Sequence, residues 1–259
     1  MKPFVRTLGF VVFFFAIYYV LDAFYFKDLR TQIDSYLNQL GISHILTYAI
    51  SGIPLYIGTY FIAMSSSIVA GLGLDKSVLQ GLLFSAVCTL PMFMGFAIFY
   101  QINTDLSLDG VLIRVVSAGF FEELFFRGFL FGLLYKYTRL GFIPAVFFGA
   151  LYFGLLHLYQ STEPMELLGI FLITFIGAII FSWLYLEWTY NIWIPVFIHM
   201  MMNLSWELFD VSENALGGVY ANVFRLVTIV LILLLTILYK RKRGERLQIN
   251  KTSLWWKSN

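Results

Sequence analysis

The chain has 259 residues, of which 60% are hydrophobic and only 12% carry a formal charge. Soluble domains carry about 25% charged residues, so a soluble globular protein is excluded. The high apolar content, with 20 glycines, 6 prolines and one cysteine, also excludes a disordered chain, a collagen and a disulfide scaffold. The net charge of +2 gives no reason to expect a nucleic-acid partner. This composition predicts an integral membrane protein.

Apolar segments of about 20 residues, the length that crosses a bilayer as a helix, recur along the whole chain. We expect eight of them, at approximately 8–26, 45–64, 79–100, 111–134, 142–159, 167–186, 192–209 and 219–239. Polar and apolar residues do not alternate along these segments as they do along the strands of a membrane β-barrel. The predicted fold class is therefore all-α, a polytopic transmembrane helix bundle of about eight spans, and the predicted organisation is one domain over residues 1–259.

The lysines and arginines outside these segments predict the orientation, because they accumulate on the cytoplasmic side of a membrane. Eight spans put both termini on one side. Twelve basic residues fall on that side, seven of them in the basic tail at 240–259, against three on the other. We expect both termini to be cytoplasmic. The compact chain without organelle targeting signals favours a bacterial plasma membrane.

The fourth segment contains three ionisable residues near its middle, Glu122, Glu123 and Arg127. Each costs about 2.5–3.5 kcal/mol at the centre of a bilayer, so a chain that keeps them is expected to pair or use them. On a helix Glu123 and Arg127 are four residues apart and can form an ion pair. Glu122 is rotated by about 100° from Glu123. Because a packing network needs one acid for one base, the surplus Glu122 favours a functional site.

Two histidines lie on other apolar segments, each with a second residue one helical turn away. His157 follows Phe153, whose ring could fix the imidazole and exclude water, and His199 precedes Asn203 on the same helix face. A carboxylate in a dry cavity is a competent general base, and an imidazole beside it can orient a water. A second imidazole and a carboxamide can stabilise an oxyanion. These residue types therefore favour peptide hydrolysis inside the membrane.

The same residues also permit a metal site. Glu122, His157 and His199 are a ligand set that catalytic zinc uses. The chain has no HExxH helix, so these ligands would have to meet through tertiary packing alone. The sequence leaves the cofactor open between none and Zn²⁺.

Three short motifs in these segments resemble those of the CAAX prenyl endopeptidase and bacteriocin-processing group of intramembrane proteases, also called the Abi family. The motifs EExxxR, FxxxH and HxxxN/D occur in order, beginning at Glu122, Phe153 and His199. The resemblance covers a core of about residues 111–209. It implies that Glu122 activates water with help from His157. It further implies that His199 and Asn203 form the oxyanion site, and that Glu123 and Arg127 orient and support the catalytic residues, with metal dependence undecided.

The resemblance implies an endopeptidase that acts on a membrane-embedded or lipidated, CAAX-like peptide near the cytoplasmic side. Its expected partners are membrane lipid and the peptide or lipidated protein substrate. The alternative is a non-catalytic membrane scaffold or bacteriocin-immunity protein of the same family, which would bind a membrane protein partner. A transporter is disfavoured because the chain shows no inverted repeat and no paired broken helices.

Overall fold

The computed structural model describes residues 3–64 and 67–257, so the predicted position of Lys2 lies outside the described residues. In chain order its helices are α1 (Pro3–Leu37), α2 (Leu40–Ser51), α3 (Ile53–Ile62), α4 (Ile68–Gly71), α5 (Val78–Phe99), α6 (Leu108–Gly110), η1 (Val111–Phe131), α7 (Gly132–Tyr137), α8 (Phe142–Leu156), η2 (Leu158–Gln160), α9 (Pro164–Glu187), α10 (Trp193–Leu208) and α11 (Val219–Lys242). The only strand-like pairing in these ranges is an isolated bridge between Leu140 and Trp256. The predicted all-α class is confirmed.

Each predicted apolar segment falls on helical structure. Six stretches are long and apolar enough to cross a membrane: Phe4–Leu37, Leu40–Ile62, Val78–Phe99, Phe142–Gln160, Pro164–Glu187 and Val219–Lys242. The two remaining predicted segments correspond to η1 with α7, and to α10. The π-helix η1 carries the charged residues of the EExxxR motif, and α10 has only 16 residues, a length of about 24 Å. These two helices carry the EExxxR motif and the pair His199 and Asn203, whereas Phe153 lies on α8 and His157 caps its end.

The predicted second segment is broken into α2 and α3 at Gly52. A Cβ atom at this position would lie 2.6 Å from Cζ of Phe125 on η1, so a side chain here would force the two helices apart. Pro54 stands in the first turn of α3, where its missing N–H costs no intrahelical hydrogen bond. The break therefore lets this kinked pair of consecutive helices pack closely against η1.

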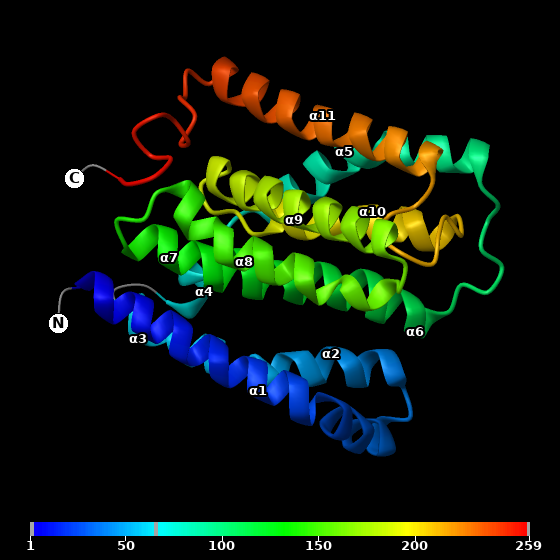
Figure 1. Cartoon of the computed structure of the whole chain (residues 1–259), viewed down its shortest axis with the longest axis horizontal. Coiled ribbons are helices and arrows are strands. Elements are labelled where there is room, and N and C mark those ends of the chain that lie inside the picture. Colours follow the sequence, from blue (N-terminus) through cyan, green and yellow to red (C-terminus); the bar gives the residue numbers. More distant parts are fainter. Residues whose placement is uncertain (1–2, 65–66, 258–259) are drawn as a thin grey trace.

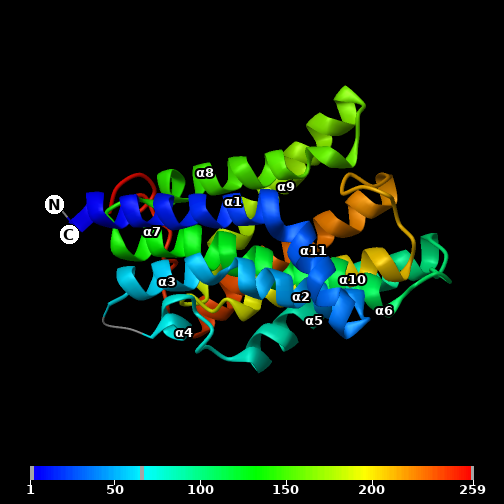
Figure 2. The same ribbon diagram turned by 90° about the horizontal axis from the view of Figure 1, so that it is seen from below.

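Helix α10 lies in the middle of the bundle, between α5 and η1 (Figures 1 and 2). Helix α11 covers α5, α8 pairs with α9, and α1 packs with α2 and α3 beyond η1. Gly119 lets η1 and α10 approach closely, because a Cβ atom there would lie 3.0 Å from the backbone nitrogen of Met200. This close approach positions the EExxxR motif of η1 beside His199 of α10.

The two ends of the described chain lie together at one end of the bundle (Figure 1). The rings of Phe4 and Trp256 have centroids 5.9 Å apart. The segment expected to be a basic tail is not a free extension. Buried Glu187, at the end of α9, accepts hydrogen bonds from Lys240 Nζ (2.6 Å) and from the backbone nitrogens of Gln248 (2.9 Å) and Ile249 (3.0 Å). Residues 248–257 are therefore tied to the bundle.

Candidate active site

Glu123 is the buried centre of the candidate site. Its side chain is fully buried, and its Oε2 atom lies 3.1 Å from Nε of Arg127, which confirms the predicted ion pair. Its other oxygen, Oε1, lies 2.8 Å from Nδ1 of His199. This second contact was not predicted. It joins η1 to α10, so one carboxylate neutralises the buried guanidinium and orients an imidazole.

Both motif histidines are held by Nδ1. In His157 this atom lies 2.8 Å from the carbonyl oxygen of Phe153, which only accepts hydrogen bonds, so Nδ1 carries the hydrogen. In His199, Nδ1 likewise donates to the Glu123 carboxylate. The Nε2 atoms of both rings are then left for other partners. A histidine fixed in this way has a defined tautomer and ring orientation.

Glu122 differs from Glu123 in its surroundings. Its side chain is 26% exposed, and its Oε2 atom is buried without a hydrogen-bond partner among the described residues. That atom lies 4.0 Å from Nε2 of His199, which is beyond hydrogen-bond distance. A polar gap of this length accommodates one bridging oxygen atom. The surplus carboxylate predicted from the sequence is therefore free to bind a water or a substrate oxygen.

Aromatic rings cover the charged cluster. The guanidinium carbon of Arg127 lies 4.5 Å from the ring centroid of Phe153 and 5.6 Å from that of Phe181. Phe153 also contacts the His157 ring, with centroids 4.5 Å apart, and Phe181 contacts the His199 ring at 5.9 Å. The two phenylalanines therefore keep water from Arg127 and flank both imidazoles.

Asn203 lies one turn beyond His199, and its Nδ2 atom donates to the carbonyl oxygen of Arg114 at 2.8 Å. A carboxamide nitrogen has two hydrogens, so this contact leaves one donor for another acceptor. Arg114 is itself held by Glu207, with Nε 2.6 Å from Oε1 and Nη2 2.6 Å from Oε2. This bidentate pair fixes the start of η1 against the end of α10 and hence fixes Asn203.

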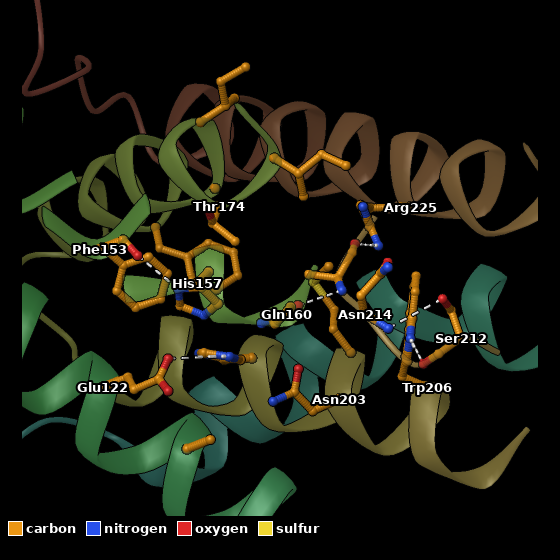
Figure 3. Close-up of a pocket in the computed structure, with 18 of the residues that line it drawn as sticks. Glu122, Phe153, His157, Gln160, Thr174, Asn203, Trp206, Ser212, Asn214 and Arg225 are labelled. Atoms are coloured by element: carbon orange, nitrogen blue, oxygen red, sulfur yellow. Dashed lines mark hydrogen bonds and ion pairs between the residues drawn. The ribbon is translucent and has the colours of Figure 1, made fainter. Parts of the chain in front are cut away.

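One cavity of about 650 Å³ brings the candidate residues together. Figure 3 shows Glu122, His157 and Asn203 around it, and His199, Arg127 and Phe153 also line it. Glu123 is not among the lining residues and lies behind them. The cavity continues past Tyr159, Gln160 and Glu213, which belong to connections at the end of the bundle opposite the termini (Figure 1). The motif residues thus share one space that reaches that end.

The residues that the zinc hypothesis needs do not form a ligand cluster. Within residues 3–64 and 67–257, no three side chains of the types His, Cys, Asp and Glu are arranged to hold a metal ion. The Nδ1 atoms of His157 and His199 are engaged with Phe153 and Glu123, an arrangement that metal-bound histidines also show. The disagreement with a zinc site therefore rests on the placement of the three side chains, and not on these hydrogen bonds.

Sequence reasoning missed several residues of the cavity. Phe181 belongs to no motif, and the Arg114–Glu207 pair joins residues far apart in the sequence, so neither gave a signal. Arg225 and Trp206 also line the cavity. Arg225 did give a signal in the sequence, because it is an ionisable residue inside the predicted eighth segment and such residues usually have a functional role.

Comparison with family models matches residues 104–205 to a family described as type II CAAX prenyl endopeptidase Rce1-like. The matched segment runs from before η1 into α10 and contains all three motifs. The predicted resemblance is confirmed by this match, and over residues 104–205 the chain is similar to the CAAX protease family of membrane proteases. Comparison with curated proteins and with solved structures gives no match.

Proposed function

We propose that the protein is an intramembrane endopeptidase that hydrolyses a peptide bond of a membrane-embedded or lipidated peptide by a glutamate-activated water. One observation carries this proposal: the unbonded Oε2 atom of Glu122 shares a cavity with His157, His199 and Asn203. The family match supports protease chemistry in the same segment.

The first step forms a tetrahedral intermediate. A water hydrogen-bonded to Glu122 and to Nε2 of His157 attacks the peptide carbonyl carbon while its proton passes to Glu122. The electron pair of the carbonyl bond moves to oxygen. The free amide hydrogen of Asn203 and the protonated form of His199, which the Glu123 carboxylate stabilises, donate hydrogen bonds to this oxyanion.

The second step breaks the carbon–nitrogen bond. The intermediate collapses, Glu122 returns its proton to the leaving nitrogen, and the products are a carboxylic acid and an amine. Glu123 and Arg127 do not touch the reacting atoms in this scheme. Both act through His199 and the packing of η1, and are positioning residues.

The proposed orientation has cytoplasmic termini in a bacterial plasma membrane, supported by the basic residues at that end of the chain. The polar end of the cavity lies at the opposite end of the bundle. With cytoplasmic termini, this end of the cavity lies on the non-cytoplasmic side, which differs from the expected cleavage near the cytoplasmic side. We keep the orientation from charge and propose that peptides reach the cavity from the non-cytoplasmic side.

The test compares membranes of cells that express the wild type or Glu122→Gln at matched levels, with all new peptide ends identified by mass spectrometry. We expect ends that are present with the wild type and missing with the variant. These ends would identify substrates. Identical sets of ends, together with a deletion phenotype that Glu122→Gln rescues, would favour the scaffold or immunity role instead.

A further inference from the structure

The connection between α10 and α11 covers one end of the cavity. We call residues 210–218 the cap segment. It contains no helix or strand, and four of its residues line the cavity, namely Ser212, Glu213, Asn214 and Ala215. Figure 3 shows Ser212 and Asn214 at the opposite end of the cavity from Glu122. The segment that matches the family model ends at residue 205, before the cap segment begins. A molecule that enters at this end of the cavity therefore meets the cap segment first.

The cap segment is built as one unit that can move without breaking a helix. Oδ1 of Asn214 accepts hydrogen bonds from the backbone nitrogens of Leu216 (3.1 Å) and Gly217 (3.4 Å). Among the described residues, 212–217 form no backbone-to-backbone hydrogen bond with any other part of the chain. Segments with so few backbone contacts are the ones that open locally in folded proteins. Gly217, with φ of +65°, and Gly218 form a flexible junction with α11.

On one side the cap segment is attached to α10 and α11. Nη2 of Arg225 donates to the carbonyl oxygen of Ala215 at 2.7 Å, and Nε1 of Trp206 donates to the carbonyl oxygen of Ser212 at 3.1 Å. The guanidinium carbon of Arg225 lies 4.7 Å from the ring centroid of Trp206. Hydrogen bonds from a charged donor are roughly twice as strong as those between neutral groups. This side therefore anchors the segment.

On the other side one neutral hydrogen bond holds the cap segment closed. Oε1 of Gln160 accepts from the backbone nitrogen of Ala215 at 2.7 Å. Nδ2 of Asn214 lies 3.4 Å from Oε2 of Glu166, longer than a normal hydrogen bond, so this contact adds little. Gln160 ends the short helix η2, and its backbone nitrogen donates to the carbonyl oxygen of His157 at 3.2 Å. The closing contact therefore lies beside a candidate catalytic histidine.

We propose that the cap segment is a gate of the cavity, which pivots on its anchored side and is held closed by the hydrogen bond between Gln160 and Ala215. Because the contact at Gln160 is neutral and that at Arg225 is charged, the gate opens at Gln160. One neutral hydrogen bond favours the closed form by about twofold to tenfold. That the gate controls the entry of a peptide substrate rests on the proposed function.

The test measures how fast water-soluble reagent reaches the cavity. Ala118→Cys puts a thiol on the cavity wall, and the protein is placed in lipid nanodiscs, which leave both faces open. A small sulfonated maleimide is added, and labelling at each cysteine is followed by mass spectrometry. Cys88 is fully buried and does not line the cavity, so its labelling reports unfolding within the same molecules.

Gln160→Met, which removes the acceptor and keeps the side-chain length, should raise the labelling rate at position 118 by about twofold to tenfold and leave Cys88 unlabelled. Thr174→Val is the matched control. It removes a polar group from the cavity wall whose hydroxyl bonds only within α9, and it should leave the rate unchanged. A rate at position 118 that Gln160→Met does not raise would overturn the inference.

A reversible lock tests the movement itself. A Cβ atom at Gly169 of α9 would lie 3.5 Å from Cγ of Leu216, so Gly169→Cys/Leu216→Cys can form a disulfide when the gate is closed. Oxidation should slow labelling at position 118 by about tenfold or more, and reduction should restore it. In the control Phe14→Cys/Gly58→Cys the corresponding distance is 2.9 Å, between α1 and α3, and oxidation should have no effect. Undiminished labelling with the cap segment locked would contradict the gate.

These results separate the gate from the proposed hydrolysis, because labelling requires no turnover. If labelling depends on Gln160 and on the lock but wild-type membranes contain no new peptide ends, the hydrolase proposal fails and the gate stands. If the wild type cleaves peptides while labelling is independent of Gln160, the gate fails and the hydrolase proposal stands.

Discussion

The Nδ1 atom of His199 lies 2.8 Å from Oε1 of Glu123, across the contact between α10 and η1. The same carboxylate faces Arg127 at 3.1 Å through its other oxygen. The second glutamate of the EExxxR motif therefore has two tasks, which are to compensate a buried cation and to orient a histidine. These tasks are separable by substitution.

Glu123→Gln should lower both stability and activity. It leaves Arg127 as an uncompensated buried charge, which costs about 3–5 kcal/mol, and it removes the anionic acceptor of His199. In the double variant Glu123→Gln/Arg127→Met we expect thermal stability in detergent to recover while cleavage stays low, because His199 still lacks its partner. Recovery of both properties would show that Glu123 acts only through packing.

Asn203→Ala should lower kcat by about 10²–10³-fold and leave KM nearly unchanged, as expected for one lost oxyanion donor. Asn203 also donates to the Arg114 carbonyl oxygen, so thermal unfolding is measured on the same preparations. A loss of activity that only follows a loss of folded protein would mean that Asn203 joins α10 to η1 and does not contact the oxyanion.

Gly177→Trp should obstruct the cavity. Gly177 lines it from α9, and a Cβ atom there would meet no atom within 4 Å. We expect kcat/KM to fall by about tenfold, equivalent to a loss of about 1.4 kcal/mol. Gly9→Trp is the matched control, because Gly9 of α1 has equally open surroundings but does not line the cavity. Equal effects of the two substitutions would contradict the assignment of this cavity as the substrate site.

Glu187→Gln should release the C-terminal segment. Glu187 is the anionic partner of buried Lys240 and accepts two backbone hydrogen bonds from the segment after α11. Removing one member of a buried pair costs about 3–5 kcal/mol, and limited trypsin digestion should then cut at Arg246 and Lys251 faster than in the wild type. Glu245→Gln breaks an ion pair on the exposed surface and should leave the digestion rate unchanged.

The sequence predicted those parts of the fold that depend on local composition. Long apolar runs predicted the helices, and the spacing of Glu123 and Arg127 predicted their ion pair. The break at Gly52 was not predictable, because the reason for it is the Phe125 ring of another helix. The docking of residues 248–257 likewise depends on Glu187, which lies far away in the sequence.

Within the site, motif spacing identified residues but not their tertiary partners. The three motifs brought Glu122, His157, His199 and Asn203 into consideration, and these line one cavity. The contact of His199 with Glu123 was missed because helix periodicity relates residues within one helix, whereas this contact joins two. Arg225 was overlooked although a charge in a membrane segment was signal enough.

The most direct measurement assays purified protein in vesicles against membrane peptides from cells that lack it, with mass spectrometry of the product ends. It compares the wild type, Glu122→Gln, and Glu166→Gln as a carboxylate control that does not line the cavity. We predict that wild type and Glu166→Gln create the same new ends and that Glu122→Gln, equally folded, creates none. Continued cleavage by folded Glu122→Gln at the wild-type positions would contradict water activation by Glu122.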